Sequence, residues 1–294
     1  FRGSGKSTIF TLSYALWSIL GRQNKKFVVI LSQTQKQAKQ HLMNIRTELE
    51  KNKVLSRDLG PFREESDEWG GYSLVVSNYN ARISAASCEQ SIRGIKHLQF
   101  RPDVIIADDV EDLNSVKTQD GRDKTYNWFK GDIIPAGNTN TKIIVIGNLL
   151  HEDSLLKRLQ KEIENDVLNG IYRGFPFLNE NGLPLWRDKF SDENAIKQEK
   201  MKVGNEIAWQ REYMLTILPD TDRVINPAWI HSYENLPIDE KSFMYAATGV
   251  DLAISENESA CYTAMVSAKI YGQGEDMKIY ILPYPVNERM DSPT

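Results

Sequence analysis

Phe1-Arg2-Gly3-Ser4-Gly5-Lys6-Ser7-Thr8 opens the chain and ends in the Gly-Lys-Ser-Thr string of a P-loop, which binds the phosphates of nucleoside triphosphates. Gly3 and Gly5 have no Cβ, so the backbone can coil tightly and turn its N–H groups toward phosphate oxygens. Lys6 supplies a positive charge for the β- and γ-phosphates, and the Ser7 hydroxyl is a ligand for Mg²⁺. The alternative interpretation is a Gly/Ser turn that caps an ordinary helix.

The residues after the loop, 9–20, are mostly apolar and predict a helix. The amino terminus of this helix would add its dipole to the phosphate site. The complete P-loop pattern has one more glycine, which would precede Phe1, and a strand that leads into the loop. We therefore expect the chain to be part of a longer polypeptide.

The composition is that of an ordinary globular protein rather than a disordered or membrane one. The 294 residues suggest two domains, and 26% are charged while 40% are hydrophobic. The net charge of −4 argues against a dedicated DNA-binding domain, whose pI usually exceeds about 9. The only two cysteines, Cys88 and Cys261, give no disulfide framework, which favours a reducing, intracellular compartment.

Alternating apolar segments predict an α/β fold with a mostly parallel sheet and flanking helices. The run 25–31 is apolar and rich in β-branched residues, which is typical of a strand buried on both faces. A helix at 33–52 should follow it, with apolar residues at helical spacing. The other expected elements are a hairpin of 72–77 with 82–87, strands at 104–107 and 142–148, and a helix at 120–134.

Two carboxylates, Asp108 and Asp109, follow directly after the short apolar strand at 104–107. This is the Walker B arrangement, in which carboxylates at the end of a parallel strand face the P-loop Mg²⁺. We assign Asp108 to the metal and Asp109 to water activation. Glu111 is the alternative water-activating residue, because a helical turn would place it on the same face as Asp108. A strand that ends in a solvated acidic turn would also explain the pattern.

Asn148 ends the apolar strand at 142–148 and is a candidate sensor of the γ-phosphate. A polar residue at a strand exit explains it equally well on spacing alone. The next polar residues, His151, Glu152 and Asp153, look like metal ligands, but adjacent helical residues point apart, so we do not assign them to a metal.

The part of the chain after residue 170 contains weaker signals. An edge strand is expected at 171–177, and helices are expected at 192–202 and 205–215. A segment rich in Pro and Asp follows at 219–227, so the domain boundary is expected between Pro219 and Ser242.

Asp251 lies within the apolar run 244–254, where an unpaired carboxylate is costly to bury. It is either an edge-strand residue that faces water or a metal ligand of a nuclease. Strands at 262–271 and 277–284 would make three successive antiparallel strands. None of the later acidic residues lies within an apolar strand as Asp251 does: Glu256 and Glu258 follow the strand end, Glu275 and Asp276 fall in a turn, and Glu288 and Asp291 fall in the tail. The partners of Asp251 are therefore expected beyond Thr294.

Taken together, these motifs resemble the large terminase subunit of tailed bacteriophages. The ATPase motifs that carry the resemblance are Arg2 within the P-loop, Ser-Ile-Arg-Gly at 91–94, the Asp108-Asp109 pair, Trp128-Phe129, and Gly-Asn-Leu-Leu-His-Glu-Asp at 147–153. Further matches are Pro-Leu-Trp at 184–186 with 187–190, 209–213, and Gly-Val-Asp-Leu-Ala at 249–253, which is similar to the first strand of that family's nuclease. The family packages viral DNA by coupling an amino-terminal ATPase to a carboxyl-terminal nuclease.

The resemblance implies a division into three parts. Residues 1–175 would be a P-loop ATPase domain that lacks its first strand, and 176–242 would be a linker subdomain with helices. Residues 243–294 would be the amino-terminal part of a ribonuclease-H-like nuclease.

The resemblance also implies roles for individual residues. Arg2 would contact the γ-phosphate, Arg93 would be offered to a neighbouring subunit's active site, and Asn148 would begin the coupling motif. ATP with Mg²⁺ would occupy the ATPase site, with Ser7 and Asp108 as the metal-associated residues. Asp251 would bind Mg²⁺ or Mn²⁺ in the nuclease.

The implied partners are double-stranded DNA, a portal protein, a small terminase subunit and identical subunits in a ring, without a membrane. The implied location is the cytoplasm of a bacterial host. Two other classes of function remain open. One is a helicase-like ATPase, which would need stacking aromatic residues along a groove. The other is a nucleotide-gated scaffold without turnover, which is favoured by Asp109 where the family more commonly has Glu.

Overall fold

The computed structural model describes residues 1–63, 68–88, 90–217, 229, 231–237, 242–252 and 263–288. The chain divides into two compact units, Phe1–Asp220 and Thr221–Thr294. The three-part division expected from the sequence stays a prediction, and the segment 219–227 with its Pro/Asp-rich break lies outside the described residues.

The first unit is built on a five-stranded mixed sheet with the order β2-β3-β1-β4-β5. Strand β1 runs parallel to β3 and β4, β4 runs parallel to β5, and only the edge strand β2 is antiparallel. The expected α/β class with a mostly parallel sheet is therefore confirmed. The strands are β1 (Phe27–Ser32), β2 (Ser73–Val76), β3 (Ala81–Ser87), β4 (Val104–Asp108) and β5 (Lys142–Ile146).

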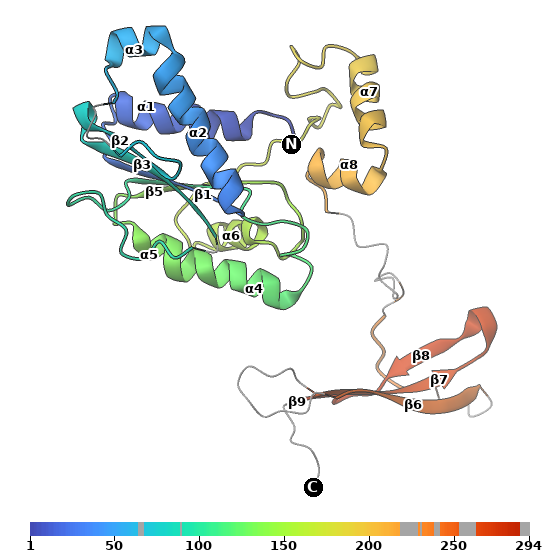
Figure 1. The fold of residues 1–294 in the computed structure, drawn as a ribbon. Coiled ribbons are helices and arrows are strands. Elements are labelled where there is room, and N and C mark those ends of the chain that lie inside the picture. Colours follow the sequence, from blue (N-terminus) through green and yellow to red (C-terminus); the bar gives the residue numbers. More distant parts are fainter. Residues whose placement is uncertain are drawn as a thin grey trace. The chain divides into compact units, whose positions relative to one another are not determined.

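Helices cover both faces of this sheet (Figure 1). Every residue of β1 is buried, and its side chains alternate between two cores: Val28 and Ile30 lie in one, Val29 and Leu31 in the other. This double burial explains the continuous apolar run. The helices of the two faces, with the short turn η2, are η1 (Thr8–Tyr14), α1 (Ala15–Leu20), α2 (Gln35–Lys51), α3 (Lys53–Leu59), η2 (Ser77–Tyr79), α4 (Gln119–Trp128), η3 (Phe129–Ile133), α5 (Ile134–Ala136) and α6 (Leu155–Glu164).

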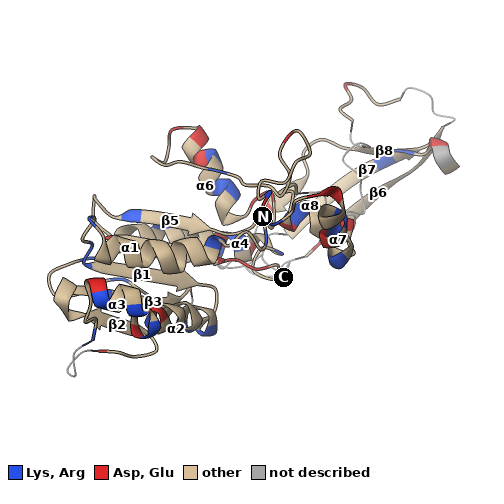
Figure 2. Cartoon of the chain, turned by 90° about the horizontal axis from the view of Figure 1, so that it is seen from above, with Lys and Arg blue, Asp and Glu red and all other residues tan. Residues whose placement is uncertain are grey.

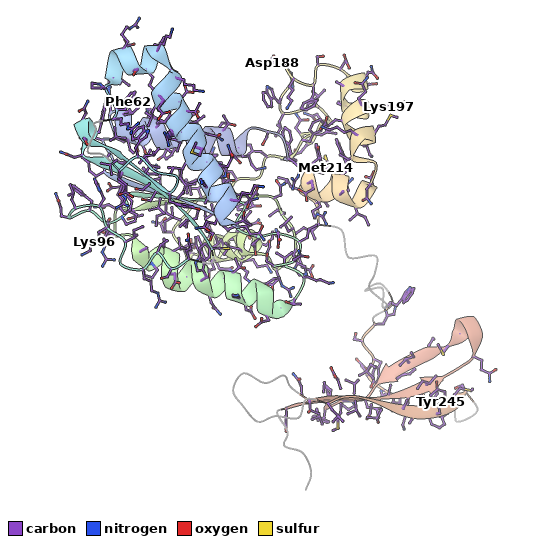
Figure 3. All side chains as sticks on the ribbon, viewed as in Figure 1. Phe62, Lys96, Asp188, Lys197, Met214 and Tyr245 are labelled. Atoms are coloured by element: carbon purple, nitrogen blue, oxygen red, sulfur yellow. The ribbon has the colours of Figure 1, made fainter. Side chains whose placement is uncertain are left out.

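The helix after the loop at residues 2–5 begins with π-type turns over η1 and continues as α1. The sequence predicted a regular helix here, and no residue in it marks the wider turns. The helix expected at 120–134 is likewise continuous but passes through π-type turns in η3. Figure 3 shows the side chains that fill the space between the helices and the sheet, with Phe62 beneath α3.

A third cluster of buried residues joins the start of the chain to the segment after α6. Phe1 packs edge-on against Phe177 at 5.2 Å between ring centroids, and Phe177 packs against Phe190 and Trp209. Helices α7 (Glu193–Val203) and α8 (Glu206–Glu212) belong to this region. The cluster therefore fixes parts of the segment 177–213 beside Phe1.

The edge strand expected at 171–177 is wrong. Ile171 is 80% exposed, and the segment 171–176 forms no strand. The apolar residues of this run include Phe177, which is held instead by the aromatic cluster and by a hydrogen bond from its N–H to the Tyr213 carbonyl (2.7 Å). Tertiary packing thus overrides a local β signal.

The second unit is an antiparallel sheet in which β7 pairs with β6 on one side and with β8 and β9 on the other. The three successive antiparallel strands expected here are present, except that the strand expected at 277–284 is shorter, at 278–281, and a further short strand follows at 286–288. The elements are β6 (Phe243–Asp251), β7 (Thr263–Tyr271), η5 (Gly274–Asp276), β8 (Lys278–Ile281) and β9 (Val286–Glu288). None of the helices among the described residues could span a membrane.

Candidate functional site

The glycine-containing loop at residues 2–5 adopts the coiled backbone that its glycines predict. Gly3 has φ 76° and Gly5 has φ 79°, in the left-handed region that side chains with a Cβ rarely adopt. No described atom lies within 4 Å of a Cβ built on either residue, so backbone conformation rather than crowding requires glycine here. The helical backbone begins at Lys6, directly after the loop. Its first N–H groups are therefore available to an anion.

Lys6 points toward the edge of the sheet where β4 and β5 end. Its Nζ donates to the Phe1 carbonyl oxygen (3.0 Å) and to Asn148 Oδ1 (2.9 Å). Burial lowers the pKa of Lys6, while the charges of Asp109 and Asp108 oppose this shift. The structure thus brings Lys6 close to Asn148 and to the two carboxylates, Asp108 and Asp109, as the sequence predicted.

Asp108 ends β4 and is 2% exposed. Burial raises the pKa of its carboxyl group, and the Ser7 hydroxyl and the His41 imidazole offset part of this rise. Among the described residues, neither carboxylate oxygen has a hydrogen bond of good geometry. A cation bound at this carboxylate would offset the cost of burying its charge.

The donor set fits Mg²⁺, which prefers oxygen ligands and keeps several waters when it binds beside phosphates. Ser7 and Asp108 would hold it. The described residues contain no group of three or more His, Cys, Asp or Glu side chains placed to hold a metal. Such a group is not required where one carboxylate, one hydroxyl and the substrate's phosphates share the ion.

Asp109 leaves the strand in a left-handed conformation, with φ 45°. Its N–H donates to the Ile146 carbonyl oxygen (3.0 Å), which ties it to the end of β5. A Cβ added to Gly147 would lie 3.4 Å from Asp109 Oδ1, so the carboxylate rests against this glycine. Asp109 is exposed and lines a small hollow together with Glu111, Gly147 and Asn148.

Glu111 is bound to the start of α6 instead. The Leu155 N–H donates to both of its carboxylate oxygens, at 2.9 and 3.0 Å. Burial raises the pKa of Glu111, and the Leu155 N–H opposes the rise. The helix amino terminus therefore already uses this carboxylate, and the geometry favours Asp109 as the water-activating residue, which stays a prediction.

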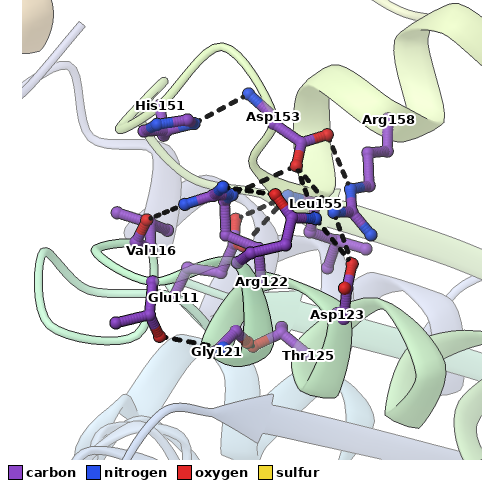
Figure 4. Close-up of polar contacts among 12 residues, drawn as sticks. Glu111, Val116, Gly121, Arg122, Asp123, Thr125, His151, Asp153, Leu155 and Arg158 are labelled. Atoms are coloured by element: carbon purple, nitrogen blue, oxygen red, sulfur yellow. Dashed lines mark hydrogen bonds and ion pairs between the residues drawn. The ribbon is translucent and has the colours of Figure 1, made fainter. Parts of the chain in front are cut away.

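Ion pairs between α4 and α6 surround Glu111 (Figure 4). Asp153 accepts hydrogen bonds from Arg158 (2.9 and 2.7 Å) and from Arg122 (3.1 Å), and Arg158 above all lowers the pKa of Asp153. His151 Nδ1 accepts from the Asp153 N–H at 3.0 Å. These side chains hold the β5–α6 connection in place.

Arg2 and Asn148 share a partner that the sequence did not reveal. Glu212, on α8, accepts from Arg2 Nε (3.0 Å) and from Asn148 Nδ2 (2.6 Å). Burial acts to raise the pKa of Glu212, but the charge of Arg2 and these hydrogen bonds outweigh it, so the pKa is lowered. A signal was present in the sequence, because Glu212 lies three residues after Trp209 and next to Tyr213 on the apolar stripe of α8.

Arg93 lies in the loop after β3, anchored by the buried side chain of Ile92. Its guanidinium pairs with Asp132 and donates to the Gly131 carbonyl oxygen (3.2 Å), both in η3. The structure therefore does not bring Arg93 to the P-loop of its own chain. The role in a neighbouring subunit stays a prediction.

Asp251 ends β6 in the second unit and is exposed. Its register partner on β7 is Ala264, which pairs on its other side with Asn287 of β9, so Asp251 and Asn287 share a face of the sheet. Glu288 lies within β9 rather than in an irregular tail as expected, because the pairing with Thr263 extends the strand. It therefore faces the opposite side from Asp251.

Of the other acidic residues that follow Asp251, Glu256, Glu258 and Asp291 lie outside the described residues. The described residues therefore give Asp251 no second carboxylate on its face of the sheet at β9. The nuclease assignment stays a prediction.

Comparison with protein-family models and with curated proteins gives no match. The resemblance to the terminase large subunit therefore rests on the sequence motifs alone.

Proposed function

We propose that the first unit binds and hydrolyses ATP at the P-loop. The observation that carries this proposal is the position of Lys6, which directly follows the coiled loop, donates a hydrogen bond to Asn148 and lies in the field of Asp108 and Asp109. A lone Gly-Lys-Ser turn would have no reason to face two carboxylates at the carboxyl end of a parallel strand.

The residues divide the work as follows. Lys6 and the loop N–H groups bind the β- and γ-phosphates and stabilise the charge that develops on them. Asp109 accepts a proton from the attacking water or orients it, in the hollow that it lines with Asn148. Mg²⁺, held through Ser7 and Asp108, would supply charge neutralisation between the phosphates.

We further propose that ATP hydrolysis drives double-stranded DNA into a procapsid and that the second unit belongs to a metal-dependent endonuclease containing Asp251. This proposal is supported by the motif resemblance, by the segment 177–213 packed against Phe1 and by the antiparallel sheet of the second unit. It includes a portal protein, a small terminase subunit and a ring of identical subunits as partners. Positive and negative residues are interspersed along α3 and α7 (Figure 2), so we expect DNA affinity to depend on the assembled ring.

The test is ATP hydrolysis by the full-length protein with and without double-stranded DNA. Lys6→Ala should abolish turnover because the phosphate charge loses its fixed cation. Lys36→Ala is the matched control, since Lys36 is exposed on α2. Near-normal hydrolysis by Lys6→Ala would overturn the P-loop assignment.

The same assay separates the alternatives. Stimulation by double-stranded DNA supports the packaging motor, and stimulation by single strands alone would support a helicase. ATP binding without any turnover would support a nucleotide-gated scaffold.

A further inference from the structure

His41 is a polar residue of α2 whose ring lies between the P-loop helix and the Walker B strand. Its Nε2 lies 3.3 Å from Asp108 Oδ2, and its Nδ1 lies 3.1 Å from Thr11 Oγ1. The imidazole therefore uses both ring nitrogens to connect η1 with the end of β4.

The helix that carries His41 is firmly placed. A capping box closes its first turn, because Thr34 and Gln37 exchange hydrogen bonds. The helix packs on the sheet through a stripe of fully buried residues, which are Ala38, Leu42, Ile45 and Leu49. The side chain of His41 itself is 18% exposed. Its backbone position is thus set by packing, and the ring reaches Asp108 from a rigid element.

Thr11 connects the same ring to the other metal-associated residue. Thr11 is 3% exposed, and its hydroxyl donates to the Ser7 carbonyl oxygen at 2.7 Å. A continuous path therefore runs from Ser7 through Thr11 and His41 to Asp108. The contacts of Thr11 and His41 therefore link Ser7 and Asp108, the two residues proposed to hold the cation.

We propose that His41 is a positioning residue that holds the Asp108 carboxylate toward the cation bound with the nucleotide, with Thr11 fixing the ring of His41. The inference rests on the proposed nucleotide site. Groups behind metal ligands set the orientation of those ligands, and their loss costs metal affinity even when every ligand is present. Neither carboxylate oxygen of Asp108 has a hydrogen bond of good geometry among the described residues, so its contact with the His41 ring, beside that with the Ser7 hydroxyl, helps to fix its orientation.

A purely structural role for His41, as a polar contact between α2 and β4, predicts lower stability with unchanged metal affinity. The positioning role predicts weaker metal affinity with unchanged metal-free nucleotide binding, because Lys6 and the loop are intact. Metal affinity and nucleotide affinity are therefore measured separately.

The experiment uses the full-length protein and Mn²⁺ as a spectroscopic substitute for Mg²⁺. Free Mn²⁺ is followed by electron paramagnetic resonance in the presence of ADP, and ADP binding in EDTA is measured by calorimetry. The variants are His41→Leu, which removes both polar atoms, His41→Gln, which keeps a donor and an acceptor, and Thr11→Val, which keeps shape and loses the hydroxyl. Gln40→Leu is the control, because Gln40 is the exposed neighbour on the same helix.

His41→Leu should weaken Mn²⁺ binding by about tenfold, the lower end of what loss of such a group costs. His41→Gln should recover most of this loss, and Thr11→Val should weaken binding about threefold through the loss of one hydrogen bond. Adding Thr11→Val to His41→Leu should cost little more, because both act through one ring. ADP binding in EDTA should stay unchanged in every variant.

Equal Mn²⁺ affinity in His41→Leu and the unchanged protein, with only a lower melting temperature, would overturn the inference. Equal losses in His41→Leu and His41→Gln would do so as well. The proposed function fails separately, if Lys6→Ala binds ADP as the unchanged protein does. In that case no cation binds with a nucleotide beside Asp108, and the inference about His41 is wrong together with the proposed function.

Discussion

Replacing Asp109 by Asn and Glu111 by Gln separates catalysis from support of the helix, since each change removes one negative charge at nearly constant shape. Asp109 has φ 45°, and Asn tolerates this left-handed backbone as well as Asp does. The loop should therefore keep its conformation in Asp109→Asn, and any loss of rate reports the carboxylate itself. A missing general base or water-positioning group lowers the rate by about a hundredfold or more.

Glu111→Gln should act on stability instead. Its carboxylate accepts the Leu155 N–H at the start of α6, and a Gln oxygen can still accept this bond without the charge. Loss of the charge at a helix amino terminus costs about 1 kcal/mol. That amount lowers the melting temperature by about 2–4 °C in a unit of this size. Even if all of it entered the activation barrier, the rate would fall only about fivefold.

Steady-state ATP hydrolysis, ATP-analogue binding and thermal unfolding of the two variants give the answer. We expect Asp109→Asn to bind ATP, melt normally and lose turnover, and Glu111→Gln to melt earlier and keep most of its turnover. The reversed pattern would refute the reasoning and assign water activation to Glu111. A loss of turnover within about threefold in both variants would show that neither carboxylate activates water.

The remaining predictions concern the contacts beyond the hollow. Glu212→Gln should bind ATP a few-fold more tightly in calorimetry, because a triphosphate no longer competes with a carboxylate for the arginine of the loop; weaker binding would mean that this carboxylate supports the bound state. Mixtures of Arg93→Ala and Lys6→Ala subunits should recover part of the hydrolysis rate if Arg93 acts on a neighbour, and no recovery in proven oligomers would assign Arg93 to its contact with η3. Asp251→Ala in the full-length protein should stop Mg²⁺- or Mn²⁺-dependent DNA cleavage while sparing ATP hydrolysis, and retained cleavage would place the nuclease elsewhere.

Strands β1 and β4 were predictable because a strand that is buried on both faces has a continuous apolar sequence. A strand such as β4, with all of its residues buried, has no solvent-facing positions and reads as an unbroken apolar run that stops at its carboxylates. The segment 171–177 has a similar but weaker apolar pattern. The prediction of a strand there is wrong because the segment does not pair with any strand of the first sheet. An apolar run predicts burial, whereas its pairing in a sheet depends on a partner strand that is distant in the sequence.

The side-chain contacts of the site could not be predicted in the same way, because their members are far apart in sequence. Arg2 and Glu212 are separated by 210 positions, and Lys6 and Asn148 by 142. The spacing of Glu111 after Asp108 suggested a shared helical face, yet the chain leaves the strand without a helical turn and Glu111 meets α6 instead. The local periodicity of the sequence does not predict such contacts between side chains that are far apart in the chain.

One local sign nevertheless marks the residues that the sequence analysis missed. Glu212 lies beside Trp209 and Tyr213 on the apolar face of α8, and His41 is next to the buried Leu42 on α2. A charged or polar group in such a position loses its hydration on folding. This loss destabilises the folded state unless the group forms a hydrogen bond or ion pair with a residue of the element that it packs against. The partner of each is a residue of the proposed nucleotide site. A polar residue on an otherwise apolar helix stripe therefore indicates that the helix packs against a polar site.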